Sequence, residues 1–591
     1  MTVIIGVSLL VADVATAQTA PSEPDTVGLA EDEDSWITQT FNRYFSSNPA
    51  SDGELDGRAI DLVDRYAEFE GRPIAVVIIH QVERFSSGTE ESAVGDGGSL
   101  GSLVKKFQTH TRQNTIRQYL LFETGQLIDP FLLADSERML RGLDFIDDVR
   151  IVLFPLSGED ESVAIIVETR DRFPLGATFK LIDVGRYEAG LYSSNVAGLG
   201  LRLDNRLIYR DDREPNLGYA GVIGIKSMGG TFIAGVAVFE DSYRRLQKGA
   251  RITRELVHPA IQWVGGAGYI RTSERDSGPE PDDAEVSDVW AGFVVPLRER
   301  SASVTTARPL LIPAISFTRK TYLDRPAVSR DTLSRFHNSQ NYLVGLTFQR
   351  FKNYKTNYLF EMGETENIPS GTIVKFSPGY QDGEFNDRGM GFFQSGYYGA
   401  RNRGDVIIGQ FDIGGFFRSG HYEDGSLLVR SAYFSPLLGE DSWKSRFYVA
   451  FSYALAINRV SDTVLRLGNA TGLRGMEDNL VKGNQRIVAN FEYRLFTPWQ
   501  MLGFRFMLLG FADIGTVTGA DDPVFEQRIY TSLGLAVRVQ NPNLVLPATQ
   551  LRVAFLNGIE DKGIVFGFEL GGLNSDLVRV PGTRPGGFTF R

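Results

Sequence analysis

The chain has 591 residues, a formal net charge of −12 and no cysteine. The lack of cysteine excludes a disulfide framework, a thiolate nucleophile and a cysteine-ligated metal site, and the acidic balance argues against a nucleic-acid-binding protein, which would be basic. The 63 glycines and the aromatic content of 11% favour many strands and turns over a helical enzyme.

The N-terminus has the pattern of a secretory signal peptide. The apolar stretch MTVIIGVSLLVADV precedes the small residues Ala15, Thr16 and Ala17, which predicts cleavage after Ala17 and a signal peptide over residues 1–17. The alternative is a ragged apolar terminus. Residues 18–72 begin as an acidic leader and continue with short helical patterning. Beyond the signal, no apolar run reaches the ~18 residues of a membrane helix, so the mature chain is either soluble or crosses a membrane as a barrel.

Residues 73–171 have the pattern of a small α/β domain. The β-branched run PIAVVIIHQV predicts a strand over residues 73–82, and residues 111–122 have the apolar side of a helix. Asp129 and Pro130 predict the N-cap and first turn of a second helix that ends near Gly142. Two more strands follow, at residues 149–154 and 163–169, so the predicted order is β-α-α-β-β. The predicted core includes Leu140, Phe145, Ile151 and Ile165.

From residue 174 to residue 572, strand-like runs follow one another between Gly, Asn and Asp turns. In RIVANFEYRL, apolar side chains alternate with Arg486, Asn490, Glu492 and Arg494, and the strands nearby show the same alternation. One apolar and one polar face on successive strands is typical of a transmembrane barrel, which satisfies its backbone without a membrane helix. The alternative is a large periplasmic β-sandwich, whose outer faces would be polar.

The predicted fold class is therefore mostly β: a transmembrane antiparallel β-barrel preceded by one small β-α-α-β-β domain. Residues 174–572 are 572 − 174 + 1 = 399 residues, which predicts about sixteen strands at roughly 25 residues for each strand and its connection. Residues 573–591 follow the last strand as a C-terminal tail.

Three short motifs lie in order in the last third of the chain. Leu473, Arg474, Gly475 and Met476 lie in a long segment between two strands, Glu492 lies in the next strand (NFEYRLFTP), and Phe511, Asp513 and Gly515 lie in FADIG. Their order and spacing resemble the outer-membrane assembly superfamily that includes BamA, TamA and the two-partner-secretion transporters. The resemblance covers nearly all of the chain after Pro73 and implies a POTRA domain of order β-α-α-β-β before a barrel of sixteen strands. One POTRA and the sequence TRDRFPLG are most similar to members of the Bacteroidetes type; Met476 stands where the family usually has an aromatic residue.

The resemblance also implies a site inside the barrel. Alternation places Glu492 and Asp513 on the lumen face, and the family's loop folds inward, so Arg474 is expected to bind both carboxylates while Gly475 lets the backbone turn. The alternative is an exposed loop arginine with the two lumen charges paired elsewhere. The predicted clasp is Arg474, Gly475, Glu492 and Asp513, with Leu473, Met476, Phe511 and Gly515 as the rest of the motif. A lateral seam is expected between the first strand, at residues 174–181, and the last, which carries Ile564, Phe566 and Phe568.

The sequence gives little indication of catalysis. His80, His110, His258, His337 and His421 form no metal-binding pattern, and there is neither a G-x-S-x-G elbow nor a P-loop. Asp412 and Glu492 were candidates for an acid/base pair, as in an outer-membrane lipase, but nothing brings a nucleophile beside them. We therefore expect no enzyme, no metal and no cofactor.

The implied function is assistance in inserting or translocating polypeptides at the bacterial outer membrane through the lateral seam, with the N-terminal domain in the periplasm. The alternatives are a two-partner-secretion-like translocation pore and a passive or structural barrel. The expected partners are outer-membrane lipids, client polypeptides (unfolded β-barrel or secreted proteins) and periplasmic or lipoprotein partners, without nucleic acid.

Overall fold

The computed structural model describes residue 55 and residues 57–82, 110–156, 161–183, 185–275, 282–297, 307–330, 332–439, 442–460, 464–477, 480–501, 504–519, 528–542, 548–558, 563–570 and 580–587. The predicted signal peptide and most of the acidic leader lie outside these residues. Within the part of the chain that is described, no helix is long and apolar enough to cross a membrane.

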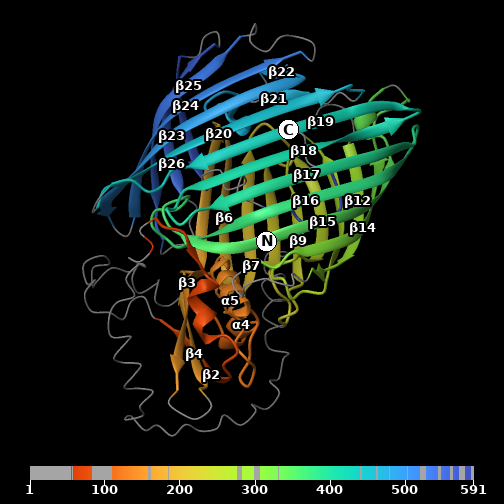
Figure 1. The fold of residues 1–591 in the computed structure, drawn as a ribbon. Coiled ribbons are helices and arrows are strands. Elements are labelled where there is room, and N and C mark those ends of the chain that lie inside the picture. The colour runs from red at the N-terminus through yellow and green to blue at the C-terminus, as the bar shows by residue number, and fades with distance from the viewer. Residues whose placement is uncertain are drawn as a thin grey trace. The chain divides into compact units, whose positions relative to one another are not determined.

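A small α/β domain precedes a large antiparallel sheet (Figure 1). In the domain, β2 runs parallel to β4, and β4 pairs antiparallel with β3. The described elements follow the predicted order β-α-α-β-β, although the first helix is shorter than predicted. Their bounds are η1 (Asp64–Phe69), β2 (Ile74–Gln81), α4 (Gln113–Arg117), α5 (Pro130–Arg141), β3 (Ile146–Pro155) and β4 (Val163–Asp171).

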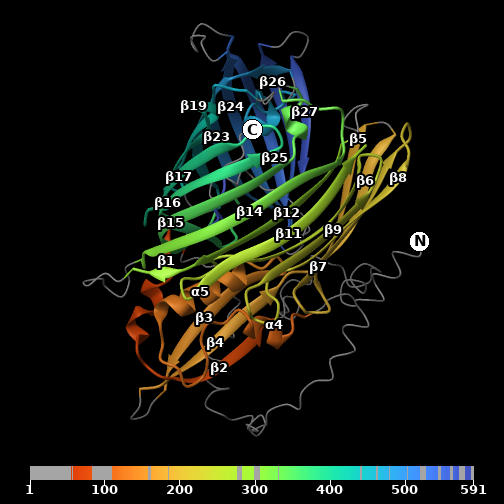
Figure 2. The same ribbon diagram turned by 90° about the vertical axis from the view of Figure 1, so that its right-hand side faces the viewer.

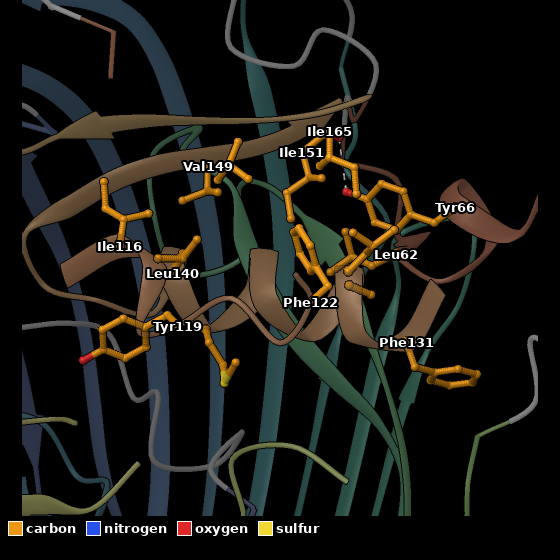
Figure 3. Close-up of a cluster of buried hydrophobic side chains, with 14 of the residues drawn as sticks. Leu62, Tyr66, Ile116, Tyr119, Phe122, Phe131, Leu140, Val149, Ile151 and Ile165 are labelled. Carbon is orange, nitrogen blue, oxygen red and sulfur yellow. Dashed lines mark hydrogen bonds between the residues drawn. The ribbon is translucent and has the colours of Figure 1, made fainter. Parts of the chain in front are cut away.

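The three-stranded sheet packs on α5 through one apolar core (Figure 3). Leu140, Phe145, Ile151 and Ile165, which the sequence predicted to be inside, are all buried. Helix α5 begins as expected: the Asp129 carboxylate accepts a hydrogen bond from the Phe131 amide at 2.9 Å, with Pro130 in the first turn. These local signals set the helix so that its apolar side faces the sheet.

The large sheet is an antiparallel meander in which each strand pairs with the next. The strands of its first half are β5 (Leu175–Asp183), β6 (Arg186–Val196), β7 (Leu201–Arg210), β8 (Leu217–Ile225), β9 (Ala234–Asp241), β10 (Arg245–Arg254), β11 (Trp263–Glu274), β12 (Asp282–Phe293), β13 (Val295–Pro296) and β14 (Leu310–Asp324). Those of its second half are β15 (Ser339–Thr356), β16 (Glu366–Gly383), β17 (Arg388–Ala400), β18 (Val406–Arg418), β19 (His421–Phe434), β20 (Lys444–Ile457), β23 (Gln485–Met501), β24 (Phe504–Thr518), β25 (Tyr530–Gln540), β26 (Thr549–Asn557) and β27 (Ile564–Leu570).

The prediction of about sixteen strands is wrong, because the sheet contains 22 strands among the described residues. The estimate of roughly 25 residues per strand and connection is too large for the first half of the meander. There the turns are tight: β9 ends at Asp241 and β10 begins at Arg245. Two members are very short. One is β13, and the other is β1 (Ile60–Asp61), which pairs with the end of β15. This strand lies where the sequence predicted short helical patterning, because two residues are too few to show strand alternation.

The two faces of the sheet differ as the alternation predicted. Phe451, Val553 and Phe566 are exposed, whereas Glu492 and Asp513 are buried on the opposite, inner face. The sheet curls, so that strands such as β6 and β7 lie behind β16 and β17 in Figure 1. An apolar outer face around a polar inner face is the arrangement of a transmembrane β-barrel and not of a sandwich.

Candidate functional site

The loop between β20 and β23 folds inward and is built around two glycines. It contains a small hairpin of two strands, β21 (Leu465–Leu467) and β22 (Val481–Gly483). The short helix η3 (Asn469–Thr471) lies in the connection between these two strands. Gly472 and Gly475 have φ angles of 109° and 87°, in the left-handed region that glycine adopts at low cost. Arg474 lies between these two glycines in the sequence. The tight turns direct its side chain toward the inner face of the sheet, called the wall below.

Two apolar motif residues anchor this loop. Leu473 and Met476 are fully buried and pack with Leu467, Val488 and Val517 of the loop hairpin and the wall. Gly515 of β24 has a packing role, because a Cβ at this position would lie 2.9 Å from a methyl carbon of Leu467. The motif positions therefore shape the surface on which the loop rests.

Arg474 lies within hydrogen-bond distance of both predicted carboxylates. Its Nε and Nη2 donate to the two oxygens of Asp513 at 2.8 and 2.5 Å, and its Nη1 donates to Glu492 at 2.7 Å. The Arg474 backbone amide also donates to Asp513, at 3.1 Å. The guanidinium lies 4.1 Å from the centroid of the Phe511 ring. Planar two-point bonds of this kind require arginine, since an ammonium cannot make them.

Three further residues hold the clasp, and the sequence reading did not identify them as part of the site. Asn490 donates to Asp513 at 2.7 Å and to the Gly472 carbonyl at 2.5 Å. The Ser532 hydroxyl donates to the Arg474 carbonyl at 2.6 Å, and Arg552 donates to Asn469 in the loop at 2.8 Å. Their inward positions on β23, β25 and β26 follow from alternation, but alternation alone does not say which lumen residues meet the loop.

Glu492 connects the clasp to a second inward segment. Arg494 donates to the second Glu492 oxygen through Nε and Nη2, at 2.8 and 2.7 Å, and its Nη1 donates to the Leu359 carbonyl at 2.6 Å. Arg494 is almost fully buried. Asp513, Arg474, Glu492 and Arg494 thus form one chain of charge-assisted hydrogen bonds.

The second inward segment, residues 357–365 between β15 and β16, was not predicted. Leu359 and Met362 are buried, and the amides of Leu359 and Phe360 donate to the Glu366 carboxylate at 2.7 and 2.9 Å. Arg505 of β24 donates to the Met362 carbonyl at 2.7 Å. The available signal was the apolar content of YLFEMGETEN at a position where a turn between two strands should be polar.

Arg446 is another missed residue. It is completely buried and donates to four backbone carbonyls: those of Gly404 and Ser435 at 2.7 and 2.6 Å, and those of Gly57 and Asn357 at 3.2 Å each. It therefore joins three strand connections and the segment before β1. The sequence shows only an arginine at an inward position, and its partners come from four separate turns.

The predicted seam residues lie on the outer face. Ile564, Phe566 and Phe568 are exposed by 67, 79 and 57%. Strand β27 is next to β5 in the order of the sheet (Figure 2). Neighbours in this order are hydrogen-bonded, so the meander closes on itself through β27 and β5.

The proposed acid/base pair has no common partner in the structure. Asp412 accepts a hydrogen bond from Gln394 at 3.3 Å and lies 3.9 Å from Arg430, whereas Glu492 is held by Arg474 and Arg494. Among the described residues, no group of three or more His, Asp or Glu side chains is arranged to hold a metal ion. The geometry of the clasp is that of a structural latch, in which an arginine joins a loop to two strands.

No family model and no curated protein matches this sequence. The structure is similar to that of BamA from Haemophilus ducreyi lacking POTRA domains 1–3 (12% identity, 84% of each chain covered, TM-score 0.37). It is also similar to CdiB from Escherichia coli (11% identity, 92% of this chain and 99% of that chain, TM-score 0.41) and to CdiB from Acinetobacter baumannii (12% identity, 84% and 73%, TM-score 0.39). At this level of identity and TM-score, no residue role or partner is transferred to this chain.

Proposed function

We propose that this protein is a non-enzymatic outer-membrane β-barrel that assists the insertion or translocation of polypeptides. In this proposal it is a single-POTRA member of the BamA/TamA-like superfamily, of the Bacteroidetes type, and residues 73–171 are its periplasmic POTRA domain. The order of the domain's elements, the inward loop and the Arg474 clasp support the assignment.

The outer face supports a membrane location. Two apolar grooves, of about 760 and 820 Å³, lie on β20 and β23–β27 among outward side chains such as Leu535, Val553 and Phe566. Side chains of this size and exposure would be costly in water but suit the acyl chains of lipids. The lipids of the outer membrane are therefore proposed as direct partners.

The observation that carries the proposal is the seam between β27 and β5. Strand β27 has seven residues, against nine in β5 and nine in β26, so the pairing that joins the last strand to the first is short. Opening of this short pairing would free two strand edges, whose N–H and C=O groups can then pair with another chain. A client strand can add to such an edge by β-augmentation, while its apolar side chains enter the bilayer beside Phe566.

The inner segments argue against a passive pore. The loop bearing Arg474 and residues 357–365 both pack on the inner face through buried side chains and charged hydrogen bonds. A barrel filled in this way must rearrange before a large solute can cross. The secretion-pore alternative requires such a rearrangement of the loop, whereas insertion through the seam does not.

The proposal can be tested with engineered cysteines, because the chain has none of its own. Phe568→Cys on β27 is combined in turn with Gly176→Cys, Ala177→Cys and Thr178→Cys on β5, and the pair that crosslinks on oxidation is retained. The protein is reconstituted in liposomes, and the rate at which an unfolded β-barrel client becomes protease-resistant is measured. We expect wild type to exceed empty liposomes, oxidation of the seam pair to abolish the gain, and reduction to restore it.

The matched control is Val553→Cys with Phe566→Cys, which joins two residues that already face each other across β26 and β27. Oxidation of this pair should leave client insertion unchanged. If the locked seam inserts the client as fast as wild type, the lateral route is wrong. If wild type does no better than empty liposomes, insertion is not the function, and depletion in cells followed by a census of outer-membrane and secreted proteins would then test translocation.

A further inference from the structure

Residues 580–587, with the sequence VPGTRPGG, follow the last strand and lie against the inner face of the sheet. Arg584 forms an ion pair with Asp288 of β12 at 3.1 Å and donates to the Thr318 hydroxyl of β14 at 3.1 Å. Ser316 of β14 donates to the Pro585 carbonyl at 3.2 Å, and Lys375 of β16 donates to the Gly582 carbonyl at 3.3 Å. Thr583 and Pro585 are buried.

Two glycines show how closely the segment and the wall fit. A Cβ at Gly345 of β15 would have Pro585 as its nearest neighbour, at 2.8 Å, and all three of its closest atoms belong to Pro585. A Cβ at Gly587 would lie 2.7 Å from the Phe392 ring of β17. The contacts therefore extend over five neighbouring strands, from β12 to β17.

The segment is attached to the wall through side chains. No backbone-to-backbone hydrogen bond joins residues 580–587 to a strand in the part of the chain that the structure describes. Pro581 and Pro585 have no N–H and cannot pair as a regular strand. The segment can consequently leave the inner face without breaking a rung of the sheet.

The wall matches the charge of the segment. Arg584 is its one charged residue, and Asp288 is buried and accepts a second hydrogen bond, from Arg251 of β10 at 2.7 Å. Loss of Arg584 would leave the buried carboxylate with Arg251 as its remaining ion-pair partner. Arg584 is also still 31% exposed in its side chain, so it is accessible to a competitor.

We propose that the inner face of β12–β17 is a binding surface for an extended basic peptide, that residues 580–587 occupy it, and that this occupancy obstructs the lumen. The occupant is displaceable because, within the described residues, it is held by one ion pair, side-chain hydrogen bonds and the packing of Val580 and Pro585, and by no backbone ladder. This inference concerns the state of the lumen and does not depend on the proposed function.

The obstruction is tested by the conductance of the purified protein in planar bilayers. Deletion of residues 580–587 should raise the conductance several-fold, and Arg584→Glu should raise it in part. Gly345→Leu should also raise the conductance, because the atoms nearest to the added side chain are those of Pro585, which it would push off the inner face. Gly409→Leu is the matched control: no atom lies within 4 Å of a Cβ at this outward position of β18, so conductance should stay at the wild-type level.

The binding surface is tested by adding the peptide VPGTRPGG to the deletion variant. The peptide should return the conductance toward the wild-type value, whereas the same peptide with Glu in place of Arg should not. Wild-type conductance in the deletion, Arg584→Glu and Gly345→Leu variants would overturn the obstruction.

A second measurement reports occupancy itself. Ser316→Cys introduces the chain's single cysteine beneath Pro585, at a position that is 5% exposed. A maleimide should label it slowly in the full chain and much faster after deletion of residues 580–587. Equal labelling rates in the two proteins would overturn the binding surface, even if the conductance differed.

Discussion

Two buried arginine–carboxylate clusters in this molecule use the same chemistry in different settings. In the small domain, Arg141 and Glu137 lie one turn apart on α5 and are joined at 2.5 Å, with side-chain exposures of 3 and 0%. In the barrel, Arg474 belongs to an irregular loop, is 13% exposed, and reaches Asp513 and Glu492 on two strands. The first pair lies within one helix, whereas the second joins a loop to a wall.

The setting decides what the ion pair stabilises. Arg141 also donates to Asp148 at 3.0 Å and to the Val149 carbonyl at 2.7 Å, so it fastens α5 to β3 inside a packed core. Tyr66 donates a hydrogen bond to the same Glu137. Burial alone would raise the pKa of Glu137, but Arg141, Lys355 and Arg65 outweigh it and hold that pKa below its usual value. Here the charges join elements of one packed core, whereas in the barrel they join a loop to two strands that already pair with each other.

The largest effect is therefore expected for Arg141→Met. The substitution leaves the Glu137 carboxylate buried without its closest cation, which should cost about 3–5 kcal/mol. Hydrogen exchange of the α5 and β3 amides in the full-length protein measures this as a loss of opening free energy.

Arg150→Met is the matched control, because Arg150 is exposed on β3. If the α5 amides exchange as slowly in Arg141→Met as in Arg150→Met, Arg141 does not stabilise the domain as described.

The Glu137 pKa also sets the direction of the pH dependence. Because the pKa of Glu137 is lower in the folded than in the unfolded state, its ionised carboxylate stabilises the domain at pH values above the usual pKa of glutamate. This stabilisation is lost as the pH falls through the folded-state pKa.

A smaller, local effect is expected for Arg474→Ala. The loop should open by about 2–3 kcal/mol more easily, since charged hydrogen bonds are lost but Glu492 keeps Arg494, and Asp513 keeps the hydrogen bond from Asn490. Arg474→Lys should recover only part of this, because lysine cannot donate to both carboxylates in one plane. Hydrogen exchange and limited proteolysis of residues 464–477 are the measurements, with barrel formation followed by heat-modifiable gel mobility.

Lys482→Ala, an exposed change on the β22 strand of the same loop, is the control. A loop that stays as protected in Arg474→Ala as in this control would show that the clasp does not hold it. Loss of the folded barrel in Arg474→Ala would show instead that this cluster, like the pair of Arg141 and Glu137, is needed for the fold itself.

The shared carboxylate allows a sharper test. Arg474 and Arg494 each hold one oxygen of Glu492, so either single loss leaves one cation in place. The double variant Arg474→Ala with Arg494→Met should therefore cost about 1–2 kcal/mol more than the sum of the two singles. Exchange rates at residues 464–477 and 357–365 give the values. Strict additivity would mean that the two inward segments are independent.

The sequence predicted the Arg474 cluster but not the pair of Arg141 and Glu137. Alternation along two strands placed Glu492 and Asp513 inside, and the resemblance supplied Arg474 as their partner. The cap at Asp129 and the burial of Leu140 and Ile151 followed from local rules. The periodicity of apolar residues predicts which side chains are buried wherever one whole face of a helix or strand contacts the same core, lumen or lipid.

Other features depend on contacts that no local pattern encodes. Residues 357–365 and 580–587 have neither helical nor strand periodicity, so their inward positions depend on tertiary contacts such as Arg494 with Leu359 and Arg584 with Asp288. The number of strands was underestimated because tight turns between short strands leave weak boundaries. Arg446 shows the same limit, since its four carbonyl partners lie in distant turns.

The smallest expected effect concerns His258, in the connection between β10 and β11. Its ring contacts Phe232 edge to face at 5.0 Å, and its Nδ1 is buried and has no hydrogen-bond partner among the described residues. Burial, with Arg138 of α5 and Arg254 nearby, lowers the pKa of His258 to about 4. A histidine kept neutral in the fold stabilises it above the ordinary pKa of ~6.5, and this contribution is lost as the pH falls toward 4.

We therefore expect acid to weaken the contact between α5 and the 255–262 connection, where Arg138 donates to the Val257 carbonyl. The loss at pH 5.5 should be about 1 kcal/mol, allowing for partial access of solvent. Hydrogen exchange of residues 255–262 at pH 7 and 5.5, corrected for intrinsic rates, measures it. His258→Phe keeps the ring but removes the titration, and should abolish the difference, while His421→Phe at an exposed position should preserve it. An equal acid response in His258→Phe and wild type would show that His258 is not its source, and Glu137 could not account for it either, because its lowered pKa acts at more acidic pH.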